Sequence, residues 1–256
     1  MRPIRSLLFY TVLFLSTVIL GSTAIVVSFV TGKANWAHVL SRFWSNVNLL
    51  AAGVKVRLKG LENLDPGQCY VFLSNHQSGF DILTLSGKLP VQFRWLAKEE
   101  LFRIPIFGPA MRASGYIPID RGDRRKALES LNQAAARVQN GTSIAIFPEG
   151  TRSPDGVMRE FKKGGFILAI KSQQPIAPIT ISGSYRVLPK RGDWMIHPGT
   201  IEVTIGRPIS TVGLKTKDND ALMRTVRESI LRHLTHEEGG HLPGSELPVE
   251  NPSQDA

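Results

Sequence analysis

The chain opens with a long apolar stretch. Between residues 7 and 30 there are 24 positions without a charged side chain, and Arg2, Arg5 and Lys33 flank them. About 20 apolar residues suffice to cross the hydrocarbon core of a bilayer, so the pattern predicts a transmembrane or deeply inserted helix. Gly21 and Ser22 would allow a break into two shorter helices that dip into one leaflet. A cleaved signal peptide is the alternative, but its apolar core normally covers only about 7 to 15 residues.

Residues 36–50 mix apolar and polar positions at helical spacing. They predict an amphipathic linker helix between the apolar stretch and the rest of the chain. Trp36, Phe43 and Trp44 are candidate anchors at a membrane interface, where aromatic side chains are enriched. Packing of the same helix against the following domain is an equally good interpretation.

From residue 54 onward, short apolar runs alternate with segments of helical character. Residues 54–58 alternate with period two, which is typical of a half-exposed strand. Further strands are predicted at residues 69–73, 91–97, 115–121, 142–147, 175–181 and 200–205, and helices after Asp81, after Asp123, after Lys163 and over 218–234. This alternation predicts an α/β fold in which a mixed β-sheet is flanked by helices, behind an N-terminal membrane-inserted helical segment.

The charge distribution suggests three parts. Residues 1–50 form the predicted anchor and linker, residues 51–236 a single domain, and residues 237–256 a Pro, Gly and Glu-rich tail. The net charge is +10, but no Lys or Arg follows Arg232, which leaves 31 basic against 16 acidic residues, a net +15, in residues 1–236. We expect a disordered tail and a body that favours anionic lipid surfaces or phosphorylated substrates. Nucleic acid is a poorer fit because the basic residues are dispersed.

A histidine and a carboxylate share one short turn after the predicted strand at 69–73. His76 and Asp81 are five residues apart, which on a continuous helix is a rotation of about 500° and would separate the two side chains. Gly79 permits the bend that brings them together. An aspartate bonded to one imidazole nitrogen leaves the other nitrogen free to act as a base. Alternatively, His76 is a surface residue and Asp81, three residues after Ser78, is part of a helix cap.

A second polar turn follows the predicted strand at 142–147. Residues 148–153 read Pro-Glu-Gly-Thr-Arg-Ser. A glycine lets an anionic ligand approach the backbone, and a hydroxyl together with a guanidinium can bind phosphate oxygens. A plain turn with a solvated arginine explains the same six residues equally well.

Four blocks of sequence occur in a recognisable order. Residues 75–81 read Asn-His-Gln-Ser-Gly-Phe-Asp, 115–121 read Gly-Tyr-Ile-Pro-Ile-Asp-Arg, 147–153 read Phe-Pro-Glu-Gly-Thr-Arg-Ser, and 176–179 read Ile-Ala-Pro-Ile. These first to fourth blocks resemble the four motifs of the glycerolipid acyltransferases, most closely of the bacterial 1-acyl-sn-glycerol-3-phosphate acyltransferases. The resemblance covers residues 54–207.

The resemblance implies acyl transfer from acyl-CoA or acyl carrier protein to the 2-hydroxyl of lysophosphatidic acid, which yields phosphatidic acid for phospholipid biosynthesis. It makes His76 the general base and Asp81 the residue that orients it. Because a carboxylate repels phosphate, Glu149 is expected to hold a basic side chain or the acceptor hydroxyl. The implied acceptor-binding set consists of Glu149, Gly150, Thr151, Arg152 and Arg121, with Lys98 as a further phosphate candidate.

The reaction implied by the resemblance needs neither a metal nor a bound cofactor. The single cysteine, Cys69, excludes an internal disulfide, and the sequence contains no Gly-x-Ser-x-Gly elbow or P-loop. The expected partners are lysophosphatidic acid, the acyl donor and an anionic phospholipid membrane, and no nucleic acid. Basic residues near the apolar stretch favour the inner membrane, with the domain on the cytoplasmic face. Alternatives are the same chemistry on another lysolipid or amino-lipid, and a non-catalytic membrane-anchored lipid-binding protein.

Overall fold

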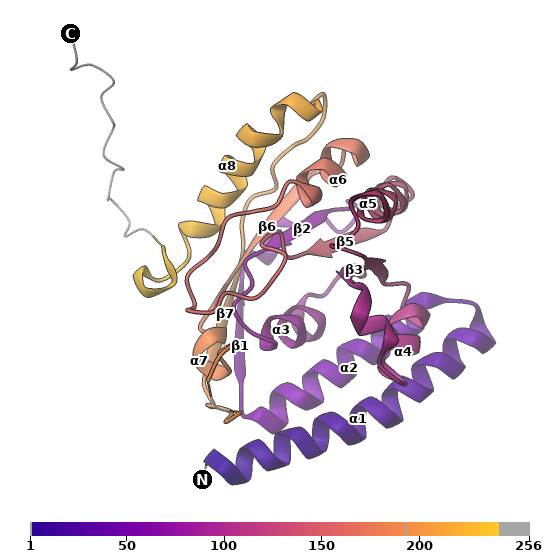
Figure 1. The fold of residues 1–256 in the computed structure, drawn as a ribbon, viewed down its shortest axis with the longest axis vertical. Coiled ribbons are helices and arrows are strands. Elements are labelled where there is room, and N and C mark those ends of the chain that lie inside the picture. Colours follow the sequence, from indigo (N-terminus) through magenta and orange to yellow (C-terminus); the bar gives the residue numbers. More distant parts are fainter. Residues whose placement is uncertain (1, 193, 241–256) are drawn as a thin grey trace.

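Seven strands form one sheet in the computed structural model, which describes residues 2–192 and 194–240 (Figure 1). The strands are β1 (Lys55–Lys59), β2 (Val71–Ser74), β3 (Phe93–Lys98), β4 (Ile117–Ile119), β5 (Ser143–Ile146), β6 (Ile176–Ser182) and β7 (Thr200–Ile205). Their order across the sheet is β1-β7-β6-β2-β5-β3-β4. Only β6 and β7 pair antiparallel, so the sheet is mixed, as the sequence predicts.

The central strands are apolar throughout because both faces of the sheet are covered. In β2, Phe72 belongs to the hydrophobic cluster on one face, while Val71 and Leu73 belong to the cluster on the other. β1 has a pattern of exposed and half-buried residues, in agreement with the period-two alternation of its sequence. Burial on two faces therefore distinguishes the central strands from the edge.

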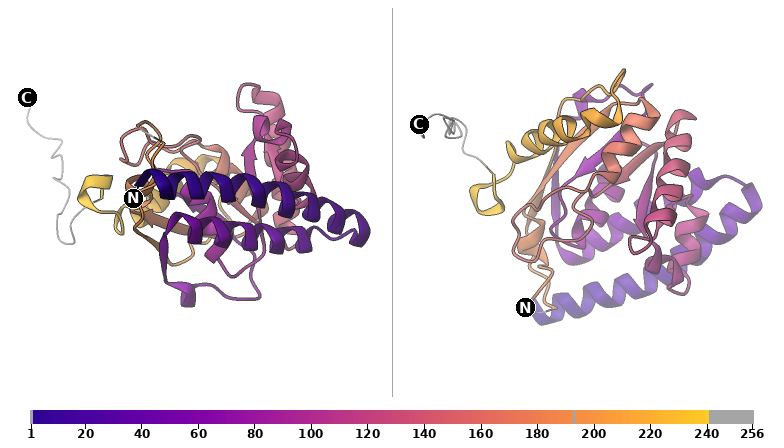
Figure 2. Two further views of the ribbon diagram at one scale, coloured as in Figure 1. Left: turned by 90° about the horizontal axis from the view of Figure 1, so that it is seen from below. Right: turned by 45° about the horizontal axis from the view of Figure 1, so that its top comes forward.

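Helices lie on both sides of the sheet (Figures 1 and 2). One face carries α5 (Arg124–Gln139), α6 (Gly164–Ser172) and α8 (Asn219–Leu231). The other carries α3 (Phe80–Lys88), on which α2 (Ala34–Ala52) packs, and α1 (Arg2–Thr31) packs in turn on α2 and on α4 (Phe107–Ala113). The remaining helical segments are α7 (Ser184–Val187) and the 3₁₀ turns η1 (Leu61–Asn63), η2 (Glu99–Arg103), η3 (Thr216–Asp218) and η4 (His236–Glu238).

The predicted membrane helix is a single continuous element. α1 runs from Arg2 to Thr31 without a break at Gly21, and in the described part of the chain it alone is long and apolar enough to cross a membrane. It is also part of the hydrophobic core, since Phe9 is only 3% exposed and stacks on Phe80 of α3 with ring centroids 5.2 Å apart. Its outward residues are mostly apolar: Ile4, Leu7, Leu8, Phe14, Leu15, Ile19, Val26, Phe29 and Val30.

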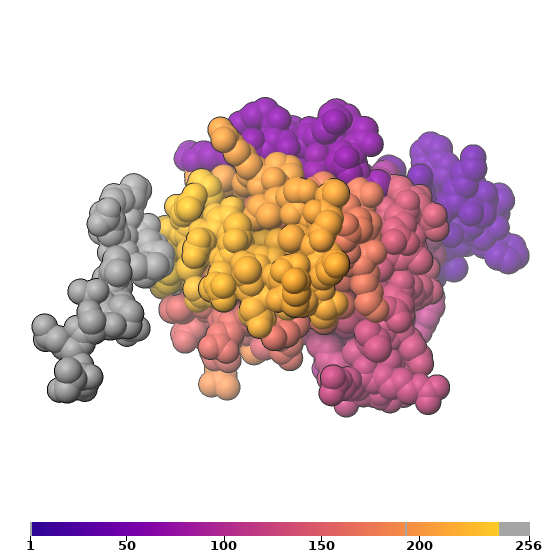
Figure 3. All heavy atoms as spheres, turned by 90° about the horizontal axis from the view of Figure 1, so that it is seen from above, coloured from indigo at the N-terminus to yellow at the C-terminus, as the bar shows by residue number. Residues whose placement is uncertain are grey.

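The linker helix satisfies both interpretations of its sequence. Leu49 is buried in the core, whereas Trp36 and Phe43 are exposed and remain candidate anchors. Trp44 is different, because its indole Nε1 donates to Thr17 Oγ1 at 3.0 Å and its side chain faces α1. The turn between α1 and α2 projects beyond the rest of the molecule (Figure 3). The helices α1 and α2 therefore share a core with the following domain.

The start of the predicted tail needs correction. Residues 236–238 form η4, and Glu238 is buried because its carboxylate accepts hydrogen bonds from Gly183 N at 2.7 Å and Ser182 Oγ at 2.5 Å. These bonds hold the segment against the end of β6. Residues 241–256 lie outside the described residues.

Candidate active site

The first three blocks meet at one edge of the sheet. β2, β3, β4 and β5 run parallel, so their carboxyl ends lie at the same edge, where open α/β sheets place their ligands. The first block follows β2, the third follows β5, Arg121 follows β4, and Lys98 is the last residue of β3. The fourth block forms part of β6 beside β2 and supports the first block from within the sheet.

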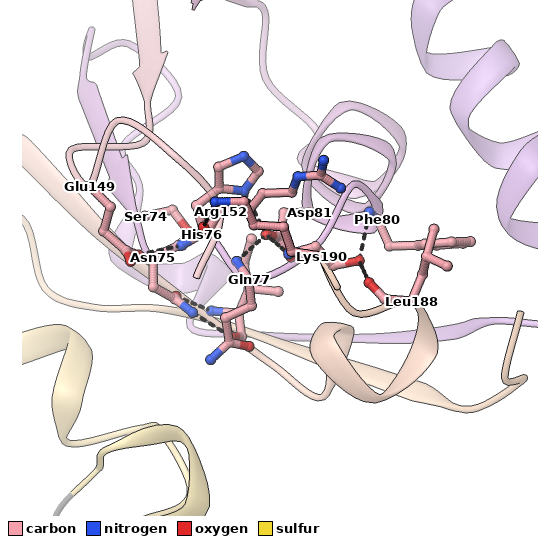
Figure 4. A network of polar contacts seen from close by, with 12 residues as sticks. Ser74, Asn75, His76, Gln77, Phe80, Asp81, Glu149, Arg152, Leu188 and Lys190 are labelled. Atoms are coloured by element: carbon pink, nitrogen blue, oxygen red, sulfur yellow. Dashed lines mark hydrogen bonds and ion pairs between the residues drawn. The ribbon is translucent and has the colours of Figure 1, made fainter. Parts of the chain in front are cut away.

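His76 and Asp81 form a hydrogen-bonded pair although they are five residues apart. Asp81 lies in the first turn of α3, fully buried, and its Oδ2 is 2.8 Å from His76 Nδ1 (Figure 4). The same oxygen accepts the backbone N–H groups of Gln77 at 2.7 Å and Ser78 at 2.8 Å. A carboxylate at Nδ1 keeps the proton on that nitrogen, so Nε2 presents its lone pair.

An aromatic stack fixes the imidazole ring. His76 lies parallel to Phe147, with ring centroids 3.9 Å apart and an interplanar angle of 8°. Phe147 stacks in turn on Trp95 at 5.0 Å. The ring is thus held at its face by Phe147 and at its edge by Asp81, and such support restricts a catalytic group to one orientation.

The third block also binds the backbone of His76. Glu149 Oε1 accepts the His76 N–H at 2.6 Å, and Ser153 N donates to the His76 carbonyl at 2.8 Å. The other Glu149 oxygen accepts the N–H of Arg159 at 2.9 Å. Glu149 therefore differs from our expectation: its partners are two backbone amides, and it joins the two blocks instead of holding a basic side chain.

Burial dominates the electrostatics of Glu149. The side chain is 3% exposed, and desolvation raises its pKa to about 7, although both N–H donors favour the charged form. In the unfolded chain the pKa is the ordinary 4.5. Between pH 4.5 and 7 the folded state therefore binds more protons than the unfolded state. The contribution of this carboxyl to stability falls as the pH rises through that window, by about 3 kcal/mol in total.

Cationic side chains surround the turn. Arg152 Nη1 lies 3.9 Å from the position that a Cβ on Gly79 would occupy, at the start of α3. Lys98 is paired with Glu100 at 2.8 Å. Among the ion pairs that the described residues form, Asp120 pairs with Lys126 at 3.7 Å and not with its neighbour Arg121. All three cations line the same cavity as His76.

This cavity has a volume of about 500 Å³ and leads from the polar turn into the apolar layer of helices. At the polar end it is lined by the site residues His76, Lys98, Arg121, Gly150, Thr151 and Arg152. Its other walls come from α1, α2 and α4, including Thr17, Leu20, Ala24, Ala37, Trp44, Phe107, Ala110 and Met111. The arrangement suits a ligand with a phosphate group at one end and a hydrocarbon chain at the other.

Comparisons with known proteins agree with this geometry. A family model described as acyltransferase matches residues 55–182, which contain the four blocks. A 1-acyl-sn-glycerol-3-phosphate acyltransferase of Pseudomonas aeruginosa is 35% identical over 218 residues, 83% of each chain. The chain belongs to the acyltransferase family.

Other acyltransferases extend the comparison. The crystal structure of the 1-acyl-sn-glycerophosphate acyltransferase of Thermotoga maritima superposes with a TM-score of 0.76 at 27% identity, over 90% of this chain and 92% of that one. A chloroplast 1-acyl-sn-glycerol-3-phosphate acyltransferase of Brassica napus is 35% identical over 69% of this chain. The chain spans about half the length of the Brassica protein.

Several residues of the candidate site escaped the sequence analysis. Asn75 clamps the first block to β6, because its side chain donates to Ile181 O at 2.7 Å and accepts from Ile181 N at 2.8 Å. Gln77 Nε2 donates to Gly156 O at 2.7 Å. Polar residues directly after a buried strand are a signal for such clamps.

Among residues 2–192 and 194–240, no cluster of His, Cys, Asp and Glu is placed to hold a metal ion.

Proposed function

We propose that the protein transfers an acyl group from acyl-CoA or acyl carrier protein to the 2-hydroxyl of 1-acyl-sn-glycerol 3-phosphate, forming phosphatidic acid. The observation that carries the proposal is the His76–Asp81 pair, which opens onto a cavity lined by Arg152, Arg121 and Lys98. The proposal also draws on the names of the Pseudomonas and Brassica relatives.

In the proposed reaction His76 Nε2 removes the proton from the 2-hydroxyl as its oxygen attacks the thioester carbonyl. A new C–O bond forms, and the tetrahedral intermediate collapses with loss of the C–S bond. The departing thiolate receives the proton from the imidazolium. Asp81 stabilises that imidazolium through the 2.8 Å contact to Nδ1 while the proton is held.

The residues that line the cavity suit a lipid acceptor or donor. A phosphate monoester carries a charge of about −1.5 to −2 near neutral pH and is matched by the guanidinium of Arg152 and its cationic neighbours. The apolar walls from α1, α2 and α4 would receive a hydrocarbon chain, at about 0.8 kcal/mol per buried methylene group. Acyl chains and headgroup are thus expected on opposite sides of His76.

The same geometry supports a membrane location. The outward apolar residues of α1 and the exposed Trp36 and Phe43 of α2 suit insertion into a bilayer. We place the protein at the inner membrane with its catalytic domain on the cytoplasmic face, where the thioester donor is available. Protease treatment of spheroplasts should leave a C-terminal tag intact until the cells are lysed.

Thiol release from oleoyl-CoA tests the reaction. The purified protein in detergent and phospholipid is supplied with lysophosphatidic acid, glycerol 3-phosphate or no acceptor. We expect release only with lysophosphatidic acid, and a loss of at least about 10²-fold in His76→Ala, because removal of a general base has effects of this size. His233→Ala, at an exposed histidine of the same chain, should retain wild-type turnover.

Other results of this assay would indicate a different function or a different base. Turnover restored only by another lysolipid or amino-lipid would keep the chemistry and change the acceptor. Lipid binding without any acyl transfer would indicate a non-catalytic lipid-binding protein. Near-normal turnover of His76→Ala would show that His76 is not the base.

A further inference from the structure

A lysine outside the four blocks, Lys190, donates hydrogen bonds to the turn at residues 148–153. Lys190 lies in the loop after α7, beyond the region that the family model matches. Its Nζ donates to the carbonyl oxygen of Arg152 at 2.8 Å and to Thr151 Oγ1 at 3.0 Å (Figure 4). Thr151 and Arg152 line the cavity, whereas Lys190 does not. The lysine therefore acts on the site through these two residues.

The loop that carries Lys190 is itself anchored at several points. Ser78 Oγ donates to Leu188 O at 2.7 Å, which ties the start of the loop to the first block. Further along, Ile196 N donates to Ser6 Oγ of α1 at 2.8 Å. The ammonium group is thus presented by a segment fixed on both sides, so little additional ordering is needed to make its two hydrogen bonds.

Both hydrogen bonds of the Lys190 ammonium group go to neutral oxygen atoms. The ion pairs formed within the described residues do not include it, and its two bonds go to a hydroxyl and a carbonyl, both neutral. Hydrogen bonds from a charged donor are stronger than neutral ones. A cation bonded to the backbone of Arg152 also makes the turn more attractive to an anion.

We propose that Lys190 is a positioning residue for the phosphate of the acceptor, which rests on the proposed function. It fixes the backbone at Thr151 and Arg152 so that the guanidinium faces the cavity, and it adds positive potential at the same place. Its removal should weaken recognition of a phosphate-bearing acceptor without changing recognition of the hydrocarbon chain. Lys190→Met tests this because it removes the ammonium group and keeps the length of the side chain.

Equilibrium binding without an acyl donor provides the main measurement. The fluorescence of Trp44 and Trp95, which line the cavity, reports binding of lysophosphatidic acid or of monoacylglycerol, its analogue without phosphate. In Lys190→Met we expect the Kd of lysophosphatidic acid to rise about 10-fold, the effect of losing one charged hydrogen bond, and that of monoacylglycerol to stay within about 2-fold. Lys190→Arg should recover most of the affinity. Arg191→Met, at the exposed neighbouring cation, should bind both lipids like the wild type.

Turnover separates this inference from the proposed function. Lipid binding that depends on Lys190 in a protein without acyl transfer would sustain the role of Lys190 and refute the reaction. An unchanged Kd for lysophosphatidic acid in Lys190→Met would overturn the inference. So would an equal loss of affinity for both lipids accompanied by a lower thermal midpoint, because that would be a purely structural effect.

Discussion

Replacing Asp81 by asparagine removes one charge and almost no volume. Asp81 Oδ2 lies 2.8 Å from His76 Nδ1, and at an effective dielectric constant near 20 a full ion pair at this distance is worth about 6 kcal/mol. The amide oxygen retains a neutral hydrogen bond of about 1 kcal/mol, and the 12% exposure of His76 allows some solvent screening. We therefore expect the imidazolium to lose about 4 kcal/mol of stabilisation. If the whole of this loss appears in the transition state, kcat falls about 10³-fold.

The assay is thiol release from oleoyl-CoA at saturating lysophosphatidic acid, with folding checked by circular dichroism. Asp81 Oδ1 is buried without a hydrogen-bond partner among the described residues, so an amide NH₂ group there should also lower stability by about 1 to 3 kcal/mol. Asp220→Asn, at an exposed aspartate paired with Lys163 on the surface, is the matched control. A folded Asp81→Asn protein that kept a tenth or more of wild-type turnover would refute the role of the Asp81 charge.

Three further substitutions examine other parts of the site. In Glu149→Gln the loss of stability between pH 4.5 and 7 should disappear, which thermal midpoints at pH 5 and pH 8 in detergent will show. Ala110→Leu fills part of the cavity and should shift preference towards shorter acyl chains in a competition between acyl-CoA species, because the longest chains lose about 0.8 kcal/mol per displaced methylene. Gly150→Ala should cost about 1 to 2 kcal/mol of stability in a thermal unfolding assay, since φ is +75° and the new Cβ would lie 3.1 Å from Lys162 Cδ.

Local patterns predicted the sheet and the first block well. Period-two alternation and buried apolar runs identify β1, β2 and β5, because strand patterns depend on which faces are covered. The His76–Asp81 contact forms as the sequence allowed, but not through a glycine-dependent bend, because Gly79 has ordinary helical angles (φ −62°, ψ −24°) and the chain turns at residues 75–78. The helix predicted after Asp123 is α5, and the Asp123 side chain caps it by accepting from Arg125 N and Lys126 N.

Long-range contacts explain what sequence reasoning missed. The stack of Phe147 on His76 joins the turns that follow β5 and β2, and no local sequence period predicts it. The partners of Glu149 are backbone amides, which carry no side-chain signature. Lys190 reaches Arg152 from 38 residues away, through a loop that is bonded to Ser6 of α1 and to Ser78 of the first block. Such contacts follow from tertiary packing, so a single sequence leaves them open.

The stacking of Phe9 on Phe80 affects any attempt to obtain a water-soluble form of this protein. Phe80 directly precedes Asp81, and Phe9 covers it within the core. Deleting α1 would expose that ring to solvent beside the His76–Asp81 pair and release the loop held at Ser6. A soluble variant would have to retain the whole of α1 and exchange only its outward side chains, such as Leu7, Phe14 and Phe29, for polar ones.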